Sequence, residues 1–538
     1  MALLSIVLPL GVIVWFFFKI ARVGRRESDL PPGPPTVPFF GNLLTFPKTS
    51  AHYKLTEWAK EYGEIYSLKL GPGTAIVLTG AGPVKELMDK RSGSTIDRPP
   101  SHMADVITGG MNMVMSRYTE NWRLLRKAAH TILTPQACTK HLPIQQAEAI
   151  QLLFDILKRP DGFYTHVRRY SSSFIFSVLF GVRSPKYEGG RVAQFFTSQH
   201  EWEHALETGA HPPMDLIPIL KKVPERWAPW KTLCKKVRTL QRDLYFGLLK
   251  ECEHRIANGL RNDCFMEGVL DRQKEFGMSR ELVGYLGGVL IEGGSDTTSS
   301  FLQTLILAMV MYPDARKKAQ EELDRVVGQD RMPTPDDIHN LPYIRAMINE
   351  THRWRPVAPL AIPHATVTEE IYNGYRIPAG STIFVNAWGI FHDENVYEDH
   401  DRFWPDRYIK SEFGTKEGVD DSDRRINFAF GSGRRICPGI HLAFNSLTIN
   451  TMNLLWAFNF DKATDPKTGK PIDCDIWGYA KGILTGPKPF QCSITPRSPH
   501  HAELIEQAFY TSTEVFLPFE GDMTEEEKKY AAAMRVHT

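Results

Sequence analysis

Long helical segments determine the fold class of this sequence. Four extended stretches are apolar at helical spacing: Gln145–Leu157, Pro229–Arg255, Arg280–Met311 and Pro313–Val326. Strand-like runs are short, namely Ile65–Leu70, Ala75–Leu78, Tyr375–Ile377 and Thr382–Asn386. The length of 538 residues alone would suggest roughly three or four domains, but no low-complexity stretch, charge block or repeat divides residues 41–497. We therefore expect a mostly α protein with small β-sheets, in which residues 41–497 form a single large domain.

The N-terminus has the composition of a membrane-spanning segment. No charged residue occurs in Met1–Phe18, and a basic cluster (Lys19, Arg22, Arg25 and Arg26) follows directly. About 20 apolar residues span a bilayer, and basic residues after the span hold that end in the cytosol. A cleaved signal peptide carries its basic residues before the apolar run instead. We therefore expect residues 1–20 to be a transmembrane signal anchor; a signal peptide or a buried helix are the alternatives.

The segments at the two ends of the large domain differ from it in composition. The run Leu30–Pro35 contains four prolines and cannot be helical, so residues 21–40 are expected to form a basic, stiff hinge. At the other end, residues 498–538 form a tail in which we expect helices at Glu503–Phe516 and Thr524–Met534. The sequence does not indicate a role for this tail.

Charge and cysteine content exclude several classes of protein. Lys and Arg number 64 and Asp and Glu number 62, and no basic tract occurs, so we expect no nucleic-acid partner. The seven cysteines are few, odd in number and without any C-x-x-C pair. This usage is typical of a reduced protein facing the cytosol, and it argues against a disulfide scaffold or a zinc site built from paired cysteines.

The most informative motif surrounds one cysteine, in the stretch Phe430–Gly439 (FGSGRRICPG). Its glycines permit a tight loop, and Pro438 directly after Cys437 predicts the first position of a helix. The positive end of that helix and the neighbouring Arg434 and Arg435 would stabilise a thiolate, which is the electron-donating axial ligand that haem iron needs for oxygen chemistry. A lone cysteine is otherwise more often a buried packing residue.

This stretch resembles the haem-binding loop of the cytochrome P-450 family at each of its constrained positions. The resemblance extends from the Pro-rich hinge to about Pro496, with the family's motifs in their usual order. It implies that Cys437 ligates the iron of haem b. It also implies that Glu350 and Arg353 pair on one helix face with Arg407, as a structural cluster and not a catalytic one.

Further motifs gain a meaning through the resemblance. Gly293 and Gly294 interrupt a helical stretch at a cost of about 1 kcal/mol each, either as a packing notch or to leave room over the iron. The resemblance places Thr297 and Asp296 in oxygen activation, with Thr297 bonding a helix carbonyl or bound oxygen and Asp296 relaying protons. It assigns the following residues to the haem propionates: Trp122, Arg126, His364 and Arg435.

An enzyme of this kind needs electrons from a partner. No complete G-x-G-x-x-G motif occurs, and too few residues follow Cys437 for a fused flavoprotein. We therefore expect a separate membrane-bound flavoprotein reductase, with NADPH acting only through it, and a location in the endoplasmic reticulum membrane with the catalytic domain facing the cytosol. Four basic residues are candidates for its docking patch or for ordinary surface charge: Arg123, Lys127, Arg424 and Arg434.

The substrate pocket is expected to be apolar. Its predicted segments are Met103–Met115, Leu286–Leu290, Val357–Ile362 and Ile483–Leu484, which carry few charges and suit a small lipophilic substrate. The motifs 288–297, 352–356 and 437–443 look like those of fungal secondary-metabolite oxygenases, in particular m-cresol methyl hydroxylases of patulin-type polyketide pathways. This similarity suggests hydroxylation of a small phenolic or other polyketide-derived ring. The alternatives are a terpenoid or indole substrate, a reductase-independent isomerase or peroxygenase, and a non-catalytic haem sensor or membrane adaptor.

Overall fold

The computed structural model describes residues 23–207 and 211–536. The predicted anchor, residues 1–20, lies outside this part of the chain. Among the helices that the structure does describe, none is long and apolar enough to cross a bilayer.

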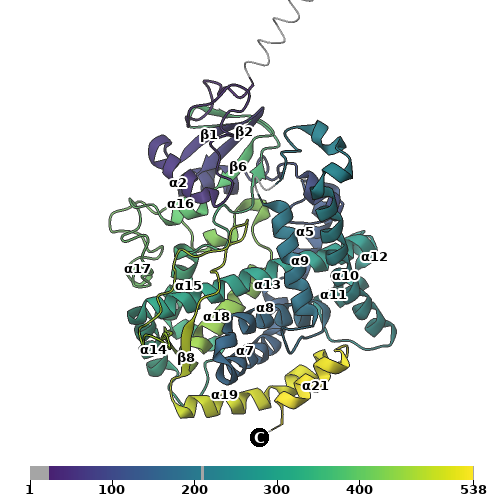
Figure 1. The fold of residues 1–538 in the computed structure, drawn as a ribbon, viewed down its shortest axis with the longest axis vertical. Helices are drawn as coiled ribbons and strands as arrows, with labels where there is room; N and C mark the ends of the chain where they lie inside the picture. The colour runs from purple at the N-terminus through teal and green to yellow at the C-terminus, as the bar shows by residue number, and fades with distance from the viewer. Residues whose placement is uncertain (1–22, 208–210, 537–538) are drawn as a thin grey trace, which may run out of the picture.

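Helices make up most of the molecule (Figure 1). In chain order they are α2 (Ala51–Tyr62), α3 (Ala81–Val84), α4 (His102–Thr108), α5 (Glu120–Ile132), α6 (Pro135–Lys140), α7 (Leu142–Lys158), α8 (Phe163–Phe180), α9 (Arg191–Leu206), α10 (Pro229–Ala257), α11 (Phe265–Asp271), α12 (Gln273–Phe276), α13 (Arg280–Met311), α14 (Pro313–Val326), α15 (Pro342–Trp354), α16 (Ala387–Phe391), α17 (Arg407–Lys410), α18 (Ile440–Ala457), α19 (Pro499–Thr511), α20 (Thr513–Phe516) and α21 (Glu525–Met534). Short helical turns that matter below are η1 (Lys85–Lys90), η6 (Ile426–Phe430) and η7 (Gly433–Arg435). The mostly α fold with small sheets is as predicted.

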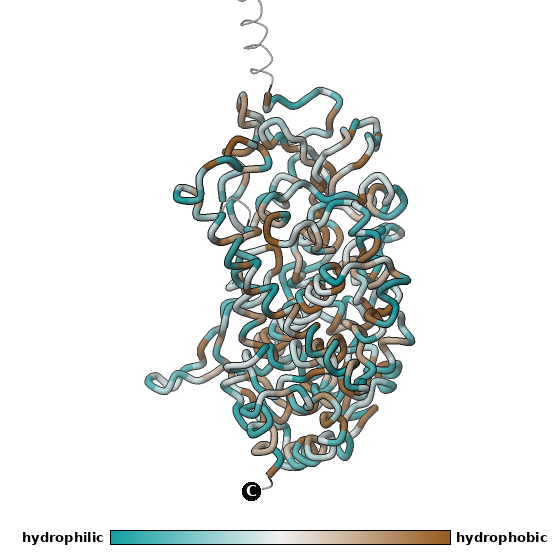
Figure 2. The backbone as a smooth tube through the Cα atoms, turned by 90° about the vertical axis from the view of Figure 1, so that its right-hand side faces the viewer, coloured by the Kyte–Doolittle hydropathy of each residue, from teal (hydrophilic) through white to brown (hydrophobic). Residues whose placement is uncertain are grey.

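Helix α13 crosses the middle of the body and packs against α8, α10 and α18 (Figure 1). It begins after Ser279, whose hydroxyl accepts a hydrogen bond from the Leu282 N–H, and it ends at Met311, with Tyr312 as the C-cap before a proline. Its bounds and those of α14 coincide with the prediction. Figure 2 shows hydrophobic and hydrophilic residues interleaved along the tube of the helical body, as expected of helices that share one core.

Three small sheets complete the fold. The largest has strand order β1-β2-β6-β3, from β1 (Ile65–Leu70), β2 (Gly73–Leu78), β6 (Thr382–Val385) and β3 (His364–Ala365), and lies beside α2 and α16 (Figure 1). Strands β1 and β2 form a hairpin in which Ile65 pairs with Leu78, while β2 and β6 run parallel. The other sheets are hairpins of β4 (Glu370–Tyr372) with β5 (Tyr375–Ile377) and of β7 (Phe458–Lys462) with β8 (Cys492–Pro496). The four predicted strands are β1, β2, β5 and β6, with ends shifted by two residues or fewer.

The C-terminal tail packs onto the body and does not extend from it. It runs along one end of the molecule as α19, α20 and α21, coloured yellow in Figure 1. Phe509 of α19 stacks on Phe154 of α7 with ring centroids 4.0 Å apart. The side chain of Glu520 accepts hydrogen bonds from Arg183 and Arg535. The predicted helix Glu503–Phe516 is interrupted at Ser512, whereas the helix predicted from Thr524 is capped by Thr524 itself.

Candidate functional site

A cavity of about 350 Å³ lies at the centre of the helical body, and Cys437 forms part of its wall. All four predicted pocket segments contribute to it, although two contribute only their last residues. These lining residues are Asn112, Met113, Val114, Met115, Val289, Leu290, Val357, Ala358, Ala361, Ile362, Ile483 and Leu484. The prediction was wrong for Met103, which does not line the cavity and belongs to an apolar cluster with Trp202 and Trp230.

The loop that carries Cys437 is closed by backbone contacts. The Cys437 N–H donates to the Phe430 carbonyl over 2.9 Å, which joins the two ends of the loop. Gly433 has φ +57° and lies so close to the backbone of Met88 that a Cβ would stand 2.1 Å from its carbonyl oxygen. Its N–H donates to the Asp89 side chain over 2.8 Å. Only glycine fits at this position, which anchors the cysteine loop against η1.

The predicted start of the next helix was wrong by two residues. Helix α18 begins at Ile440 with Gly439 as its N-cap, and Pro438 lies in the turn before it. The reason is that Gly439 already has a non-helical ψ of 15° while its carbonyl accepts the first helical bond, from Ala443. Cys437 still lies at the positive end of α18. Burial raises the pKa of its thiol, while the Gly439 N–H and the Arg126 guanidinium lower that pKa.

Three buried arginines from distant segments lie together on the cavity wall. Arg126 of α5 donates to the Ile436 carbonyl (2.5 Å) and to His130 (2.8 Å), and Arg435 of η7 donates to the Ile96 carbonyl (2.8 Å). The third, Arg98, was not predicted; it donates to the Val114, Ile362 and Pro363 carbonyls. Burial lowers the pKa of Arg435 to about 9 and, together with Arg435 and Arg126, depresses the pKa of Arg98 far below its usual range.

Two aromatic or imidazole side chains complete this basic wall. The Trp122 indole N–H donates to the Met113 carbonyl over 3.1 Å, and its ring lies 4.2 Å from the Arg435 guanidinium. Trp122 therefore supports Arg435 here as a cation–π partner. The His364 Nδ1 lies 2.9 Å from the Thr95 carbonyl, and its ring lines the cavity. Burial and the nearby Arg98 lower the pKa of His364, so its second nitrogen carries a proton only if an anion binds beside it.

The chemistry of this wall fits haem. Arg98, Arg126 and Arg435 donate to backbone carbonyls, and Asp97, whose charge acts on Arg98 and Arg435, is bound to Arg117 over 2.6 Å. A cluster of buried positive charge without a matching carboxylate is costly unless an anionic group binds it. The two propionates of haem are such groups, and Cys437 on the same cavity would ligate the iron as a thiolate.

Helix α13 forms another wall of the cavity, and its two central glycines have different environments. A Cβ on Gly294 would stand 2.3 Å from Ile175 of α8, so this glycine is a packing notch. A Cβ on Gly293 would meet nothing within 4 Å, and Gly293 lines the cavity. The Thr297 hydroxyl, also on the cavity, donates to the Gly293 carbonyl over 2.6 Å. Both glycines line the cavity, but open space remains only at Gly293, whereas Gly294 is the packing notch that was the alternative.

Asp296 has a partner that the sequence did not reveal. The carboxyl groups of Asp296 and of Glu203 on α9 are hydrogen-bonded, and burial and Asp296 raise the pKa of Glu203 to about 9. Burial also raises the pKa of Asp296, while Glu203, Arg168 and Gln199 lower it. Gln199 holds Glu203 by donating from Nε2 over 3.2 Å. Glu203 therefore keeps its proton at neutral pH beside the Asp296 carboxyl, which suits a proton relay from α9 to α13.

The predicted Glu350 cluster forms a buried ion network outside the cavity. Arg353 donates to both oxygens of Glu350 over 2.7 and 2.8 Å, and Arg407 donates to the same carboxylate over 3.2 Å. The Trp404 N–H adds a bond of 2.7 Å to Glu350. The other N–H groups of Arg353 donate to the carbonyls of Phe391, His400 and Arg402. This network joins α15 to the irregular segment 391–407 that precedes the cysteine loop.

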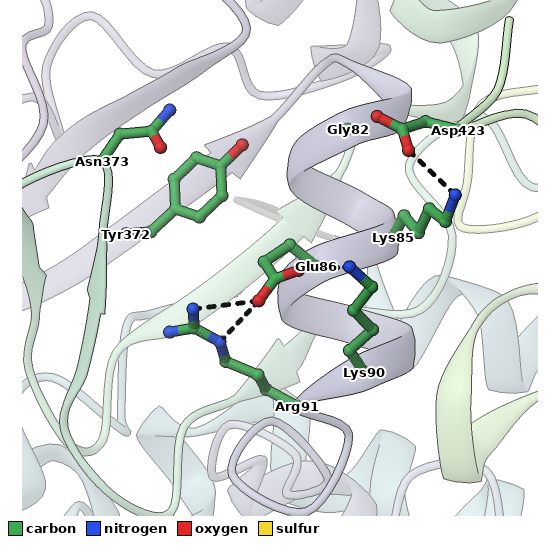
Figure 3. Close-up of a pocket in the computed structure, with 8 residues that line it drawn as sticks. All are labelled: Gly82, Lys85, Glu86, Lys90, Arg91, Tyr372, Asn373 and Asp423. Carbon is green, nitrogen blue, oxygen red and sulfur yellow. Dashed lines mark hydrogen bonds and ion pairs between the residues drawn. The ribbon is translucent and has the colours of Figure 1, made fainter.

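The surface next to the cysteine loop is rich in cations. Arg123, Lys127 and Arg434 are exposed, whereas Arg424 is half-buried and donates to the Tyr397 hydroxyl over 3.0 Å. A shallow depression beside η1, which touches η7, adds Lys85, Lys90 and Arg91 (Figure 3). Its carboxylates are already paired: Glu86 with Lys90 at 3.0 Å and with Arg91 at 2.9 Å, and Asp423 with Lys85 at 3.0 Å. The depression thus has three cations and two carboxylates, and exposed Arg123, Lys127 and Arg434 add positive charge nearby.

Comparison with known proteins agrees with this geometry. Residues 31–494 match the family model described as Cytochrome P-450. A cytochrome P-450 monooxygenase of Armillaria gallica is 47% identical over 503 residues, covering 94% of this chain and 96% of that protein. One from Arthrobotrys oligospora is 40% identical over 524 residues, covering 95% and 97%. One named patI, from Penicillium expansum, is 39% identical over 522 residues, covering 96% and 98%.

Proposed function

The chain belongs to the cytochrome P-450 family, and we propose that it hydroxylates a small phenolic or other polyketide-derived aromatic compound in fungal secondary metabolism. It is a monooxygenase that uses haem with an axial cysteine thiolate and receives electrons from a reductase. The observation that carries the substrate proposal is the cavity, where Cys437 and three arginines share a small space with a mainly apolar wall. A mainly apolar wall favours a neutral lipophilic ligand, and the fungal relatives support the pathway class.

Different residues of the chain would bind the haem and leave space for the reaction. Cys437 would ligate the iron, while Arg98, Arg126 and Arg435 would hold the propionates. When bound, the haem supplies the oxygen activation and the oxidising power. Gly293 leaves space on the cavity side of α13, and the Thr297 hydroxyl is held 2.6 Å from its carbonyl.

Proton delivery is proposed for the acid pair of Glu203, which lines the cavity, and Asp296 on α13. Asp296 receives a proton from Glu203, whose carboxyl stays protonated at neutral pH because its pKa is about 9. Thr297 is the next residue along the helix and lines the cavity. This arrangement favours a monooxygenase over an isomerase or peroxygenase, since those reactions need no proton relay of this kind.

The electron donor in this proposal is an NADPH-dependent flavoprotein reductase that docks beside the cysteine loop. Exposed Arg123, Lys127 and Arg434 supply positive charge there, and Lys85, Lys90 and Arg91 extend it across η1. Such a surface attracts an acidic partner and accelerates its association at low salt. Raising the ionic strength should therefore slow electron transfer from the reductase.

The same proposal places the enzyme on the endoplasmic reticulum membrane, with the catalytic domain facing the cytosol. The uncharged run of residues 1–18 and the basic cluster after it support a single anchor. Exposed apolar side chains also lie near the start of the described chain, at Phe39, Phe40 and Leu44. A second segment exposes Ile217, Ile219 and Trp227. Both segments lie near the turn between β1 and β2, the first at Phe39 beside Gly71 and the second at Leu216 beside Gly73. These side chains suit the surface of a bilayer.

Two measurements test the proposed function. The reduced protein with carbon monoxide should show the absorption band of a thiolate-ligated haem, and Cys437→Ala should lose both this band and all turnover; a variant that retains activity would refute the assignment. Incubation with a fungal reductase and a panel of phenols, terpenes and indoles should give hydroxylated phenols. Turnover of terpenes or indoles alone would exclude the phenolic substrate.

A further inference from the structure

A second carboxyl group, besides that of Glu203, lines the mainly apolar cavity from α13, one helical turn before Asp296. It belongs to Glu292, which is 8% exposed and lines the cavity together with Asn112. Three neutral donors hold it. The Asn112 Nδ2 donates to Oε2 over 2.9 Å, the Gln241 Nε2 donates to Oε1 over 3.2 Å, and the Tyr245 hydroxyl donates to Oε1.

The burial of the Glu292 carboxyl costs folding free energy. Burial raises the pKa of Glu292 to about 7, against the opposing effect of the hydrogen bonds from Tyr245 and Asn112. Its recorded partners in the described chain are all uncharged, so no cation offsets the burial. An unmatched carboxyl in an apolar wall breaks the rule that buried charges are paired, and such exceptions concentrate at functional sites.

The hydrogen-bonding capacity of this cluster is not used up. A carboxylate oxygen accepts about two hydrogen bonds. Oε1 of Glu292 accepts two, but Oε2 accepts only the one from Asn112, so one acceptor position of Oε2 remains. Asn112 cannot reverse its amide, because its Oδ1 accepts the N–H groups of Val114 at 3.0 Å and Met115 at 3.1 Å. Its Nδ2 therefore always points to Glu292 and keeps a second N–H.

The supporting residues fix the carboxyl from behind. A Cβ on Gly288, one turn before Glu292, would stand 2.3 Å from the Tyr245 ring, so only glycine lets α10 bring Tyr245 this close. Tyr245 and Gln241 are both buried on α10, and both donate to Oε1 of Glu292. The other oxygen, Oε2, accepts from Asn112, which lies in the loop before α5. The spare acceptor and the spare donor are thus adjacent, on two residues of the cavity wall.

An adjacent acceptor and donor match one chemical group in particular. A hydroxyl both donates one hydrogen and accepts one, whereas a methyl group does neither and an ether oxygen only accepts. We propose that Glu292 and Asn112 bind the hydroxyl group of an otherwise apolar, phenol-type substrate and so select it over hydrocarbons of the same shape. This inference rests on the proposed function, because it assumes that the cavity is the substrate site.

Position along α13 gives this binding a consequence for the reaction. Thr297 follows Glu292 by five residues, which is about 7.5 Å along a helix axis. Both side chains line the cavity, with Gly293 between them. A substituted ring anchored at Glu292 by its hydroxyl therefore extends along the wall toward Thr297, and its orientation is set by the anchor and not by the apolar residues alone.

The test compares ligands that differ at a single group. Full-length holoprotein is titrated with 3-methylphenol, 3-methylanisole and m-xylene, and binding is followed by the haem spectral shift and by calorimetry. A hydrogen bond to a carboxyl contributes enough that 3-methylphenol should bind about tenfold to a hundredfold more tightly than m-xylene, with 3-methylanisole close to m-xylene. Equal affinities for 3-methylphenol and m-xylene in the wild-type protein would overturn the proposal, and this result needs no variant.

Variants then assign the preference to Glu292. Glu292→Gln, which keeps the size of the side chain, should reduce the ratio of the two affinities toward one. The matched control is Val357→Ala, an apolar cavity residue, which should weaken both ligands alike and leave the ratio unchanged. A ratio unaffected by Glu292→Gln would overturn the assignment. Loss of the thiolate-type carbon monoxide band in wild-type protein would instead refute the proposed function, so the two failures are distinguishable.

Discussion

Replacing Glu350 by glutamine removes a carboxylate that two buried guanidinium groups share. The side chains of Glu350 and Arg353 are 0% exposed, and that of Arg407 is 2% exposed. Arg353 donates to both carboxylate oxygens over 2.7 and 2.8 Å, which is the bidentate geometry of a strong charge-assisted pair. Glutamine presents an NH₂ group to one of these N–H groups, so one of the bonds becomes a repulsive contact between donors.

The magnitude follows from the burial of the charges that remain. Removing one partner of a buried ion pair typically costs about 3–5 kcal/mol, because the other charge is left without compensation. Two guanidinium groups face Glu350, but Arg353 and Arg407 keep carbonyl partners in the segment 391–407, so we expect a value within that range and not twice as large. Against a total folding free energy of roughly 5–15 kcal/mol, this is a severe loss.

Urea unfolding of the full chain in detergent, followed by tryptophan fluorescence at matched haem content, measures the effect. The control is Glu321→Gln on α14, because Glu321 is 62% exposed and its Lys317 partner lies 3.9 Å away. That exposed pair should contribute less than about 1 kcal/mol. If Glu350→Gln and Glu321→Gln lowered the free energy of unfolding by the same amount, the reasoning about buried charge would be wrong.

Three further outcomes are expected. Thr297→Ala should consume NADPH without matching product, because the hydroxyl held near the Gly293 carbonyl is lost; unchanged coupling, measured as product per NADPH, would contradict its role. Glu203 keeps its proton to pH about 9 when folded but releases it near its ordinary pKa when unfolded, so the free energy of unfolding should fall as pH rises across this window. Glu203→Gln should flatten that fall in urea titrations at several pH values, and an unchanged slope would argue against the shared proton with Asp296. Phe509→Ala should destabilise the protein by about 3–5 kcal/mol by emptying the stack on Phe154; a loss below about 1 kcal/mol would show that the tail does not contribute to the stability of the body.

Local sequence signals predicted features that neighbouring residues determine, such as the ends of helices. Ser279 and Pro313 set the ends of α13 through capping and the missing proline N–H, and the structure has the same bounds. Strand β5 was predicted but its partner β4 was not, although the turn between them at Asn373 and Gly374, with positive φ of 48° and 80°, is a local hairpin signal. At Cys437 the motif identified the loop, but Pro438 was placed in the helix, because proline is also favoured in the turn that precedes one.

The residues that the sequence did not reveal all act across long distances in the chain. Arg98 joins the basic wall because its neighbour Asp97 bridges to Ala365 of β3, which brings Arg98 beside His364. Glu203 meets Asp296 only in the folded chain, where α9 packs on α10 and α8 beside the cavity, and no spacing in the sequence relates them. Gly294 and Gly293 are adjacent and both line the cavity, yet only Gly294 packs closely against Ile175 of α8. Such assignments need the tertiary packing and not the motif.

Buried charges are paired within the chain where they support the fold, and they are not paired where the protein binds another group. In the Glu350 cluster, and in the network where Arg169 and Arg183 meet Glu148, each buried carboxylate faces a guanidinium of the same chain. Around the cavity the charges are not matched: three arginines lack a carboxylate, Glu292 lacks a cation, and two acids face each other. A folded chain gains nothing in stability from such groups, since each is costly without a ligand, a substrate or a proton to complete it. The mismatch therefore marks three sites of use along one cavity: the basic wall for the haem propionates, Glu292 with Asn112 for a substrate hydroxyl, and Glu203 with Asp296 for the proton.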